Sequence, residues 1–516
     1  MFLLLIVLTF KVLIIFFFFS FVFILITQLI HYKLKWQHNS IFKGKKAISF
    51  VHPFCADCGG GEKVLWRMIK SLISYYEEPS IINQNQQEKQ KLKINIISGR
   101  KDNVEELLQK LKLRFGIVLG GDDDEDDENI YSKNINKSIQ YQVGNKLVID
   151  VELIPLRSGY MLRPQKFLTM FLQILGQIYF AFEIITKVYS DVYCDTTGLP
   201  FTYFVLKYFG HAKVTAYTHY PFISNKMIED VVHNKPGVHS RGILNKFQTF
   251  KKIKLYYYKF ILKLYELMGN KCLSFSYVNS TWTFKHMKQL WRELDRNGNL
   301  KILYPPCSIS LYKDAAKNRQ RQNIIVSFAQ FRPEKNQAMQ IRILSKLKER
   351  LKNYQGFDNL ELHIIGGVRN LDDQNILNEL IKYSGEMGVN DFVKFLPNGT
   401  KEQILEEFSK AKIGIHTMVD EHFGITLIEM MAAGLILVTH NSAGAKDDIL
   451  VSFEDGSKPG FLVENEEEYI DQIEEILLRY EKMRNIIIPA STKRAEIFSD
   501  DAFKTQFLSQ MNEFLI

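Results

Sequence analysis

The chain opens with a long apolar run. Residues 1–30 are almost wholly apolar, and residues 12–30 give nineteen consecutive positions without a charge. A helix of that length can span a bilayer. A cleaved signal peptide is the alternative, but no basic stretch precedes the run and no small residues at a cleavage spacing follow it. We therefore predict a transmembrane anchor over residues 1–32.

Basic residues follow the apolar run directly and form a juxtamembrane segment at 33–46. The positive-inside rule places such a segment, and the body of the chain behind it, in the cytosol. We therefore expect a single-pass protein with cytosolic domains. Three Asn-x-Ser/Thr sequons, which such a topology leaves without glycan, stand at Asn136, Asn279 and Asn398. The lysines of the segment are Lys33, Lys35, Lys43, Lys45 and Lys46.

Beyond the anchor, short apolar runs alternate with stretches of helical period. This alternation predicts an α/β fold with buried, mostly parallel strands. A helix of this pattern, EKVLWRMIKSLISYY, covers residues 62–76. The strands expected in the first half of the chain lie at 47–51, 93–99, 191–198 and 213–221.

A glycine triplet separates the first predicted strand from the first predicted helix. It consists of Gly59, Gly60 and Gly61. Glycine lets the backbone come close to a ligand, and the start of a helix presents free N–H groups. The turn is therefore a candidate phosphate or sugar contact, and its alternative is a plain tight turn.

Three segments depart from the alternation. Residues 118–146 include the acidic run DDDEDDE and have the composition of a solvated insertion. Residues 153–186 are apolar and aromatic, which is typical of an interfacial or re-entrant helix or of a buried one. Residues 241–268 carry seven Lys or Arg among aromatic residues, a pattern of helices on anionic membrane surfaces or of a helix with one solvated face.

The strand expected at 213–221 ends in Thr-His-Tyr-Pro, which places His219 at the edge of the sheet. A lone histidine at a strand end is commonly structural. It is also suited to contact a sugar hydroxyl if a ligand lies at that edge.

The second half of the chain repeats the α/β pattern after a polar linker at 314–323. Arg332 and Lys335 follow the next strand three residues apart, so both can point into one cleft and hold a diphosphate, Arg as a fork and Lys as a point charge. Gly366 and Gly367 end the following strand and permit close backbone approach to a nucleotide.

The stretch HTMVDEHFGITLIEMMAAG at 416–434 reads as the end of a strand, a loop and a helix. Glu421 falls in the loop and Glu429 in the helix, eight residues apart. Open α/β sheets bind ligands at this carboxyl edge, and the start of a helix suits a diphosphate. A carboxylate one turn into the helix can accept hydrogen bonds from a ribose. The alternative is that both glutamates are solvated surface residues.

Composition narrows the classes of function. At 516 residues and 46% hydrophobic content, the chain is long enough for two domains besides the anchor. Its net charge of +9 suits anionic lipid or diphosphate, and no nucleic-acid motif accompanies it, so we expect no nucleic-acid partner. Five cysteines fit a reducing compartment, and the pair Cys55 and Cys58 has no second pair to complete a zinc site.

The string E-H-F-G-I-T-L-I-E-M-M-A-A-G at 421–434 resembles the donor motif of retaining GT-B glycosyltransferases of family 4. Within that group the chain resembles the α-1,2-mannosyltransferases that extend the dolichol-linked oligosaccharide. The resemblance covers about residues 47–515. The further blocks that carry it, in the same order, are VHPFC…GGGEKVLW (51–66), THYP (218–221), VNSTWT (278–283), YPPC (304–307), FRPEKN (331–336) and IIGGVRN (364–370).

The resemblance implies a GT-B fold, in which two Rossmann-like domains face a cleft behind an N-terminal transmembrane helix. The expected divisions are the anchor at 1–32, the basic segment at 33–46, an acceptor domain at 47–313 with the insertion at about 118–146, the linker at 314–323, a GDP-mannose domain at 324–496, and a helix at 497–516 that packs back on the first domain.

The implied reaction moves mannose from GDP-mannose to a lipid-linked trimannosyl chitobiose, twice and with retention of configuration. The resemblance makes Glu421, His219, Arg332 and Lys335 the catalytic candidates. Neither a metal nor another cofactor is expected, because basic residues and helix N–H groups hold the diphosphate and no Asp-x-Asp stands at a strand end. The donor-site candidates are Gly59, Gly60, Gly61, Arg332, Lys335, Gly366, Gly367, Phe423, Gly424, Ile425 and Glu429.

The expected partners are GDP-mannose, the dolichol-diphosphate oligosaccharide, the membrane of the endoplasmic reticulum and other early mannosyltransferases of the pathway. Two alternatives stay open. Another membrane enzyme of family 4, such as one that transfers N-acetylglucosamine from UDP to phosphatidylinositol, shares the donor motif. A non-catalytic protein that binds nucleotide sugars needs only part of it.

Overall fold

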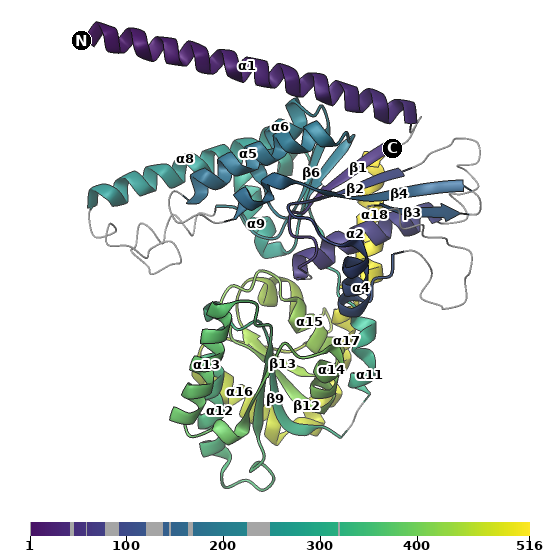
Figure 1. The fold of residues 1–516 in the computed structure, drawn as a ribbon. Coiled ribbons are helices and arrows are strands. Elements are labelled where there is room, and N and C mark those ends of the chain that lie inside the picture. Colours follow the sequence, from purple (N-terminus) through teal and green to yellow (C-terminus); the bar gives the residue numbers. More distant parts are fainter. Residues whose placement is uncertain are drawn as a thin grey trace. The chain divides into compact units, whose positions relative to one another are not determined.

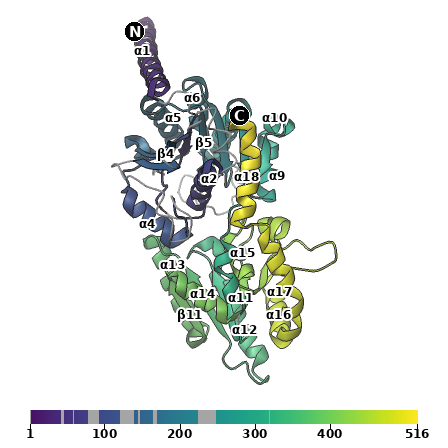
Figure 2. The ribbon, with the colours of Figure 1, turned by 90° about the vertical axis from the view of Figure 1, so that its right-hand side faces the viewer.

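The computed structural model divides the chain into two compact units (Figures 1 and 2). Unit 1 comprises Met1–Tyr277, His286–Lys301 and Met511–Ile516, and unit 2 comprises Val278–Lys285 and Ile302–Gln510. The structure describes residues 2–41, 46–57, 59–77, 92–119, 138–143, 146–163, 169–223, 248–317 and 320–515.

An eight-stranded sheet forms the centre of unit 1, with the strand order β3-β4-β2-β1-β5-β6-β7-β8. The pairs from β4 to β6 are parallel, and β3 is antiparallel to its neighbour β4. The strands are β1 (Lys46–Val51), β2 (Leu92–Ser98), β3 (Ser138–Val143), β4 (Lys146–Pro155), β5 (Val192–Asp195), β6 (Lys213–Thr218), β7 (Phe275–Val278) and β8 (Leu300–Ile302).

The strands β1, β2, β5 and β6 are buried along almost their whole length, as expected of parallel strands covered on both faces. The helices that accompany this sheet are α1 (Phe2–Ile41), α2 (Gly60–Glu77), α4 (Val104–Phe115), α5 (Thr169–Lys187), α6 (Tyr203–Tyr208), α8 (Gln248–Cys272), α9 (Thr281–Leu290) and α10 (Arg292–Arg296).

Helix α1 packs on α5 through its carboxyl-terminal half. The ring centroids of Phe23 and Phe182 lie 5.2 Å apart. His31 Nδ1 lies 2.9 Å from the carbonyl oxygen of Ile185, and Gln28 Nε2 donates to the carbonyl oxygen of Phe209. By length and composition, Phe18–Ile41 is the one helix of the described chain apolar enough to cross a membrane.

The structure refines three of the predicted segments. Strand β3 falls inside the range expected for the acidic insertion and joins the sheet. The apolar stretch 153–186 is not one helix: it contains the end of β4, a 3-10 helix at Arg157–Leu162 and most of α5. Of the basic stretch 241–268, residues 241–247 lie outside the described part and the rest belongs to α8.

A six-stranded sheet forms the centre of unit 2, with the order β11-β10-β9-β12-β13-β14 and every pair parallel. Its strands are β9 (Gln322–Phe328), β10 (Glu361–Gly366), β11 (Val393–Pro397), β12 (Ala411–His416), β13 (Ile436–His440) and β14 (Phe461–Val463). Its helices are α11 (Lys313–Ala316), α12 (Gln337–Leu351), α13 (Leu371–Glu386), α14 (Lys401–Lys410), α15 (Ile425–Ala432), α16 (Glu466–Leu478), α17 (Tyr480–Glu496) and α18 (Asp500–Leu515).

The start of α9, up to Lys285, belongs to unit 2. Both carboxylate oxygens of Asp448 accept from the backbone N–H of Thr281, at 3.0 and 3.1 Å. The Trp282 ring stacks on His422 with a centroid distance of 4.8 Å. Burial raises the pKa of Asp448 even though this backbone donor favours its charged form.

Arg321 lies within the predicted linker but is only 9% exposed. Its guanidinium donates to the carbonyl oxygens of four residues that end or begin neighbouring elements: Ala315, Phe408, Ala411 and Ala433. The side chain therefore satisfies carbonyl groups at the ends of α11, α14 and α15 that no helical N–H can reach.

We predict that Arg321→Met lowers the free energy of unfolding by roughly 2–4 kcal/mol, because four buried carbonyl oxygens lose a charged donor. Thermal unfolding of the detergent-purified chain measures the change. Arg479→Met is the matched control, since Arg479 is exposed and pairs only with Glu475 one turn away. Equal melting temperatures for the two variants would contradict this role of Arg321.

Candidate functional site

A charged cluster lies at the carboxyl ends of two neighbouring strands in unit 2. Lys335 follows β9, and Glu421 follows β12. The Lys335 Nζ donates to Glu421 Oε2 at 2.5 Å, and His416 Nε2 lies 3.0 Å from the same oxygen. Two residues 86 positions apart in the sequence are thus brought into one ion pair at the edge where parallel sheets bind ligands.

The surroundings keep the Glu421 carboxylate ionised. The side chains of Glu421 and Lys335 are 15% and 17% exposed. Burial alone would raise the pKa of Glu421, but the hydrogen bond with His416 and the charge of Lys335 outweigh it and hold that pKa far below its usual range. A carboxylate of this kind is a weak general base and a strong electrostatic partner.

Backbone interactions position the loop that carries Glu421. Gly424 has φ +100°, and a Cβ there would lie 2.9 Å from Leu427 Cδ1. The carbonyl of Glu421 accepts from the N–H of Gly444, and the N–H of Asp420 donates to Ser442 Oγ. The segment after β13 therefore fixes the loop after β12.

Backbone strain concentrates at this site. Three of the five non-glycine residues with positive φ in the described chain are Asn336, Asp420 and Ala443. Each lies beside Lys335 or on one of the two loops around Glu421. Such conformations persist where the surrounding structure enforces them, and they cluster at functional sites.

Thr417 connects the two loops of the cluster. Its hydroxyl donates to the carbonyl of Lys335 at 2.8 Å, and Gln340 Nε2 donates to that hydroxyl at 2.9 Å. Tyr469 OH donates to the carbonyl of His416 at 2.6 Å. Hydrogen bonds from side chains therefore hold the backbone carbonyls of Lys335 and His416 in place.

Glu429 lies one turn into α15 and interacts with Tyr312. Burial, followed by the charge and hydrogen bond of Glu429, raises the pKa of the Tyr312 hydroxyl well above its usual value. Tyr312 therefore stays protonated and donates to the Glu429 carboxylate, which orients that carboxylate.

Three further predicted donor residues of unit 2, Arg332, Gly366 and Gly367, differ in exposure and packing. The Arg332 side chain is 40% exposed, and its guanidinium lies 3.9 Å from the Glu334 carboxylate. A Cβ on Gly366 would lie 2.1 Å from the carbonyl oxygen of Ala329, so close chain packing requires this glycine. A Cβ on Gly367 would lie 3.9 Å from its nearest neighbour, Gln330 Cγ, so close packing does not require this glycine.

The predicted residues at the start of α15 contribute backbone rather than side chain. Phe423 is 3% exposed and stacks on Tyr304 with a centroid distance of 5.6 Å. Its side chain belongs to the core. Ile425 is the first residue of α15, where backbone N–H groups have no helical partner.

In unit 1 the structure brings His219 and the glycine triplet together. A Cβ on Gly61 would lie 3.3 Å from His219 Nε2, so the glycine makes room for the imidazole ring. His219 Nε2 is buried and has no hydrogen-bond partner in the described part of the chain. Burial, followed by the nearby His52, lowers the pKa of His219 to about 4, so the ring is neutral at pH 7.

Gly59 precedes helix α2 and Gly60 begins it, and the N–H group of Gly59 is already occupied. Gly59 N–H donates to Glu62 Oε2 at 2.7 Å, and Glu62 Oε1 lies 3.4 Å from His52 Nε2. His52 Nδ1 lies 2.8 Å from Thr196 Oγ1. The glycine turn is therefore capped by a side chain of its own helix, and His52 and Glu62 line the position beside His219.

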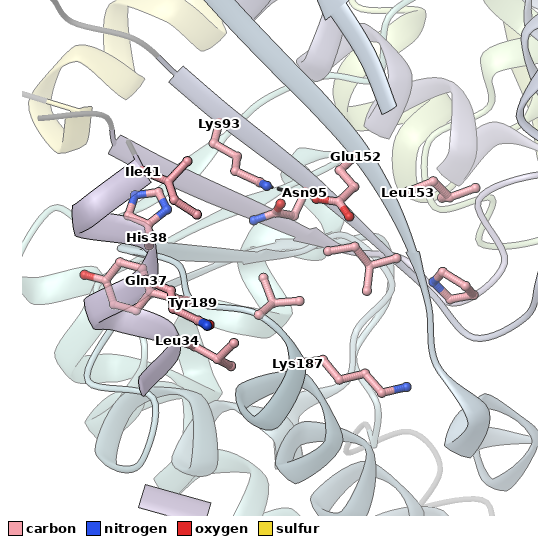
Figure 3. Close-up of a pocket in the computed structure, with 13 residues that line it drawn as sticks. Leu34, Gln37, His38, Ile41, Lys93, Asn95, Glu152, Leu153, Lys187 and Tyr189 are labelled. Atoms are coloured by element: carbon pink, nitrogen blue, oxygen red, sulfur yellow. Dashed lines mark hydrogen bonds and ion pairs between the residues drawn. The ribbon is translucent and has the colours of Figure 1, made fainter. Parts of the chain in front are cut away.

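A cavity of about 470 Å³ lies elsewhere in unit 1 (Figure 3). It lies between the carboxyl-terminal end of α1 and the strands β2 and β4. Its polar lining includes His38, Lys93, Asn95, Glu152 and Tyr189. None of the predicted site residues lines it. The cavity is therefore distinct from both clusters described above.

Sequence reasoning missed His416, Thr417 and Tyr312 in unit 2 and the His52–Glu62 pair in unit 1. His416 ends the strand that precedes Glu421 and Thr417 follows it directly, and this position is the local signal that could have indicated them. The contacts of Tyr312 and His52 cross long stretches of chain, so no spacing rule indicates them. Cys55 is buried, and burial raises the pKa of its thiol to about 12, while Cys58 lies outside the described residues.

Comparison with protein families identifies both halves of the chain. Residues 45–123 and 103–291 match the model described as ALG11 mannosyltransferase N-terminus. Residues 309–494 match the model described as Glycosyl transferases group 1.

Several curated proteins are similar along nearly the whole chain. A human GDP-Man:Man(3)GlcNAc(2)-PP-Dol alpha-1,2-mannosyltransferase is 33% identical over 477 residues, which are 91% of this chain and 87% of the human protein. The protein of that name from Dictyostelium discoideum is 34% identical over 475 residues, 90% of this chain and 83% of its own length. The resemblance stated from the sequence motifs is thereby confirmed.

Solved structures confirm the predicted GT-B fold. Anabaena Alr3699/HepE, solved in complex with UDP and glucose, has a TM-score of 0.56 at 16% identity and covers 91% of this chain and all of its own. Sucrose-phosphate synthase from Thermosynechococcus elongatus has a TM-score of 0.58 at 12% identity and covers 91% of this chain and 99% of its own. At these identities the likeness concerns the fold alone.

We predict that alanine affects the stability of the chain differently at two of the predicted donor glycines. Gly424→Ala should destabilise the chain by about 1–3 kcal/mol, because its positive φ and the contact with Leu427 both oppose a Cβ. Gly367→Ala should leave stability unchanged, because its Cβ would make only ordinary van der Waals contacts, the nearest at 3.9 Å. Thermal unfolding of both variants in detergent measures the change in stability. A loss at Gly367 as large as at Gly424 would refute the view that only Gly424 is required by backbone conformation and packing.

Proposed function

Because this chain belongs to the family of GDP-Man:Man(3)GlcNAc(2)-PP-Dol alpha-1,2-mannosyltransferases, we propose that it transfers mannose from GDP-mannose to the dolichol-diphosphate-linked trimannosyl chitobiose. It forms α-1,2 linkages and adds two residues in sequence. The observation that supports this most directly is the ion pair of Lys335 and Glu421 at the carboxyl edge of the sheet in unit 2. The family models and the relatives supply the substrate class.

Lys335 is proposed to hold the diphosphate of the donor. Its ammonium group is oriented by Glu421 and lies at the end of β9, and the start of α15 adds unpartnered backbone N–H groups near Gly424 and Ile425. A diphosphate leaves as a stabilised anion, so the catalytic requirement is positive charge in a fixed place. Arg332, which is more exposed, is proposed to add a second contact to the same diphosphate.

Glu421 is proposed to act by its charge. Its carboxylate stays ionised at neutral pH and accepts hydrogen bonds, so it suits the mannose hydroxyls and the positive charge that develops on the sugar ring. Transfer with retention requires such stabilisation on the face that both leaving group and acceptor use. Glu429, oriented by Tyr312, is proposed to bind the donor ribose.

The cluster of unit 1 is proposed to contact the sugar or the acceptor. His219 is neutral, and its buried Nε2 needs a hydrogen-bond partner that the described chain does not supply. A sugar hydroxyl can donate to this nitrogen or accept from it. The backbone at Gly367 and the glycine turn at Gly59–Gly61 remain proposed donor contacts.

We propose that the reaction needs no metal, because Lys335 and helix N–H groups supply the positive charge that a cation would otherwise bring. We also propose that the protein is a single-pass protein of the endoplasmic reticulum with both units in the cytosol. Partnership with other early mannosyltransferases is a further expectation that rests on the family.

We predict that Glu421→Gln lowers transfer by roughly 10²–10³-fold, because the neutral amide no longer stabilises positive charge. Lys335→Met should lower it to a similar extent by removing the diphosphate contact. The assay supplies labelled GDP-mannose and the lipid-linked trimannosyl acceptor to the solubilised chain, with EDTA present. Growth of the glycan by two mannoses in the unsubstituted chain is the expected result.

The matched control is Glu386→Gln, which breaks an exposed lysine–glutamate pair on the surface of α13 and should transfer normally. Near-normal turnover of Glu421→Gln would refute the role of Glu421. Transfer from a UDP-sugar instead of GDP-mannose would overturn the donor, and loss of all transfer in EDTA would overturn metal independence.

The sequons give a test of orientation. Asn398 lies exposed at a turn, and Asn279 is 6% exposed within unit 2. A cytosolic body leaves both unmodified, because oligosaccharide is added on the lumenal side. We predict no endoglycosidase shift for the chain made in microsomes. A sequon added before Met1 should be glycosylated as the positive control, and glycan on Asn398 would contradict the topology.

A further inference from the structure

A short 3-10 helix in unit 1 presents a row of three exposed side chains. The helix spans Arg157–Leu162 and follows β4. Every third side chain of a 3-10 helix points to the same side. Arg157, Tyr160 and Arg163, which follows the helix directly, therefore share one face. All three are exposed, Tyr160 by 66%. The residues buried on the other face are Ser158, Gly159 and Leu162.

A carboxylate from α5 holds the backbone of this helix. Glu183 accepts from the N–H of Arg157 at 3.0 Å and from the N–H of Ser158 at 2.9 Å, and the Ser158 hydroxyl donates to it as well. Burial alone would raise the pKa of Glu183, but its bonds with Lys187 and Ser158 outweigh burial and lower that pKa to about 2. The carboxylate is therefore charged and occupies the first N–H groups of the helix, so a ligand at this helix meets its exposed side chains.

Two glycines allow the helix to lie close to its neighbours. A Cβ on Gly159 would lie 2.1 Å from the carbonyl oxygen of Gly99, on the loop after β2. A Cβ on Gly176 of α5 would lie 2.6 Å from the carbonyl oxygen of Met161. Non-bonded atoms do not approach that closely, so a side chain at either position would displace the helix. Packing on two sides thus fixes the exposed row in place.

The row lies on the same edge of the sheet as His219. Strands β4 and β2 stay paired to their carboxyl ends, where the N–H of Leu156 donates to the carbonyl of Ser98 at 2.7 Å. The N–H of Gly99 donates in turn to the carbonyl of Pro53, on the loop that leads from β1 to the glycine turn. Four strand spacings separate β6, which precedes His219, from β4. This is about 19 Å, at roughly 4.8 Å per spacing.

The charge of this segment is positive. Residues 153–182 include three basic residues and no acidic one. No ion pair involves the Arg157 side chain within the described residues. Arg100, on the neighbouring loop, already holds Asp57 and Asp102 at 2.5 and 2.8 Å. Guanidinium groups bind phosphate through paired N–H donors, and an exposed aromatic ring can pack against the apolar face of a sugar. The row therefore suits a sugar that carries phosphate.

We propose that the row of Arg157, Tyr160 and Arg163 binds the diphosphate end of the lipid-linked acceptor. The arginines hold the diphosphate, and the tyrosine ring packs on the sugar joined to it. The inference rests on the proposed function and goes beyond it, because it gives the acceptor a contact far from the reacting hydroxyl. Several sugar rings separate that hydroxyl from the diphosphate, so the two ends of one acceptor can reach two places about 19 Å apart on this edge.

Two acceptors that differ only in the diphosphate test the assignment. In both, trimannosyl chitobiose is joined to the same short isoprenoid alcohol, in one through a diphosphate and in the other by a direct glycosidic bond. The full chain is assayed in non-ionic detergent with saturating GDP-mannose, so that no anionic lipid competes. For the unsubstituted chain we expect a KM about tenfold lower for the diphosphate acceptor than for the neutral one.

Arg157→Met combined with Arg163→Met should raise the KM of the diphosphate acceptor by about tenfold, to that of the neutral acceptor. The KM of the neutral acceptor, the KM of GDP-mannose and kcat should stay unchanged, because neither arginine touches the reacting groups. Arg292→Met, at an exposed arginine on α10 of the same unit, is the matched control and should behave as the unsubstituted chain.

An equal rise of KM for both acceptors, or no rise for either, would overturn the role of the arginines. Thermal unfolding of each preparation checks the fold. If the double variant melts at a lower temperature than the unsubstituted chain, Arg157→Gln alone is assayed in its place. It is expected to raise the KM of the diphosphate acceptor only.

Tyr160 has a separate signature. Tyr160→Ala should raise the KM of both acceptors by about threefold to tenfold, because both carry the same sugar. Tyr160→Phe keeps the ring and should leave both values unchanged. A loss in Tyr160→Phe as large as in Tyr160→Ala would mean that the hydroxyl makes the contact, and it would overturn the packing of a sugar on the ring.

Binding separates this site from the proposed transfer. A fluorescent analogue of the diphosphate acceptor is titrated with the full chain and with the double variant, without any donor. If the unsubstituted chain binds the analogue about tenfold more tightly than the variant but transfers no mannose, the proposed function fails and the site stands. If the variant binds and transfers normally, the site fails and the function stands.

Discussion

The ion pair between Lys335 and Glu421 is the interaction on which the site of unit 2 depends. It joins the loops after β9 and β12, which are neighbouring parallel strands of the same sheet. Because both partners are mostly buried, the pair requires the second partner that His416 provides and the backbone ties of Thr417 and Gly444. A buried charge without such partners would be costly. The strained backbone around the pair shows that the surrounding fold enforces this geometry.

The two units offer complementary chemistry. Unit 2 collects charges: an ionised carboxylate, an ammonium group and the open start of α15. Unit 1 collects neutral and paired groups: His219, whose pKa lies well below 7, and the His52–Glu62 pair that caps the glycine turn. An ammonium group and free helix N–H groups attract a nucleoside diphosphate, and a neutral imidazole can form hydrogen bonds with hydroxyl groups. This division is consistent with a donor held by unit 2 and a sugar contacted by unit 1.

Within the described chain, unit 1 carries most of the large exposed apolar side chains. They lie on its helices α1, α5, α6 and α8, as Phe171, Tyr208 and Tyr256 do, whereas exposed apolar residues of unit 2 such as Leu371 and Ile486 stand singly. A substrate with a long lipid tail stays in the bilayer, so the unit that meets it benefits from lying on the same surface. The fold therefore places these apolar side chains on the unit proposed to bind the acceptor.

The sequence by itself determined the α/β character, the order of most strands, the apolar helix at the start and the family, because apolar periodicity and glycine-rich turns are local signals. It also singled out Lys335, Glu421 and His219 as candidate site residues. Only the tertiary structure decided which residues meet: it placed Phe423 in the core, set Gly61 against His219 and buried Arg321 among four carbonyl groups. It also paired β3 with β4. These outcomes depend on strand order and on contacts between residues far apart in the chain, and no local pattern encodes such contacts.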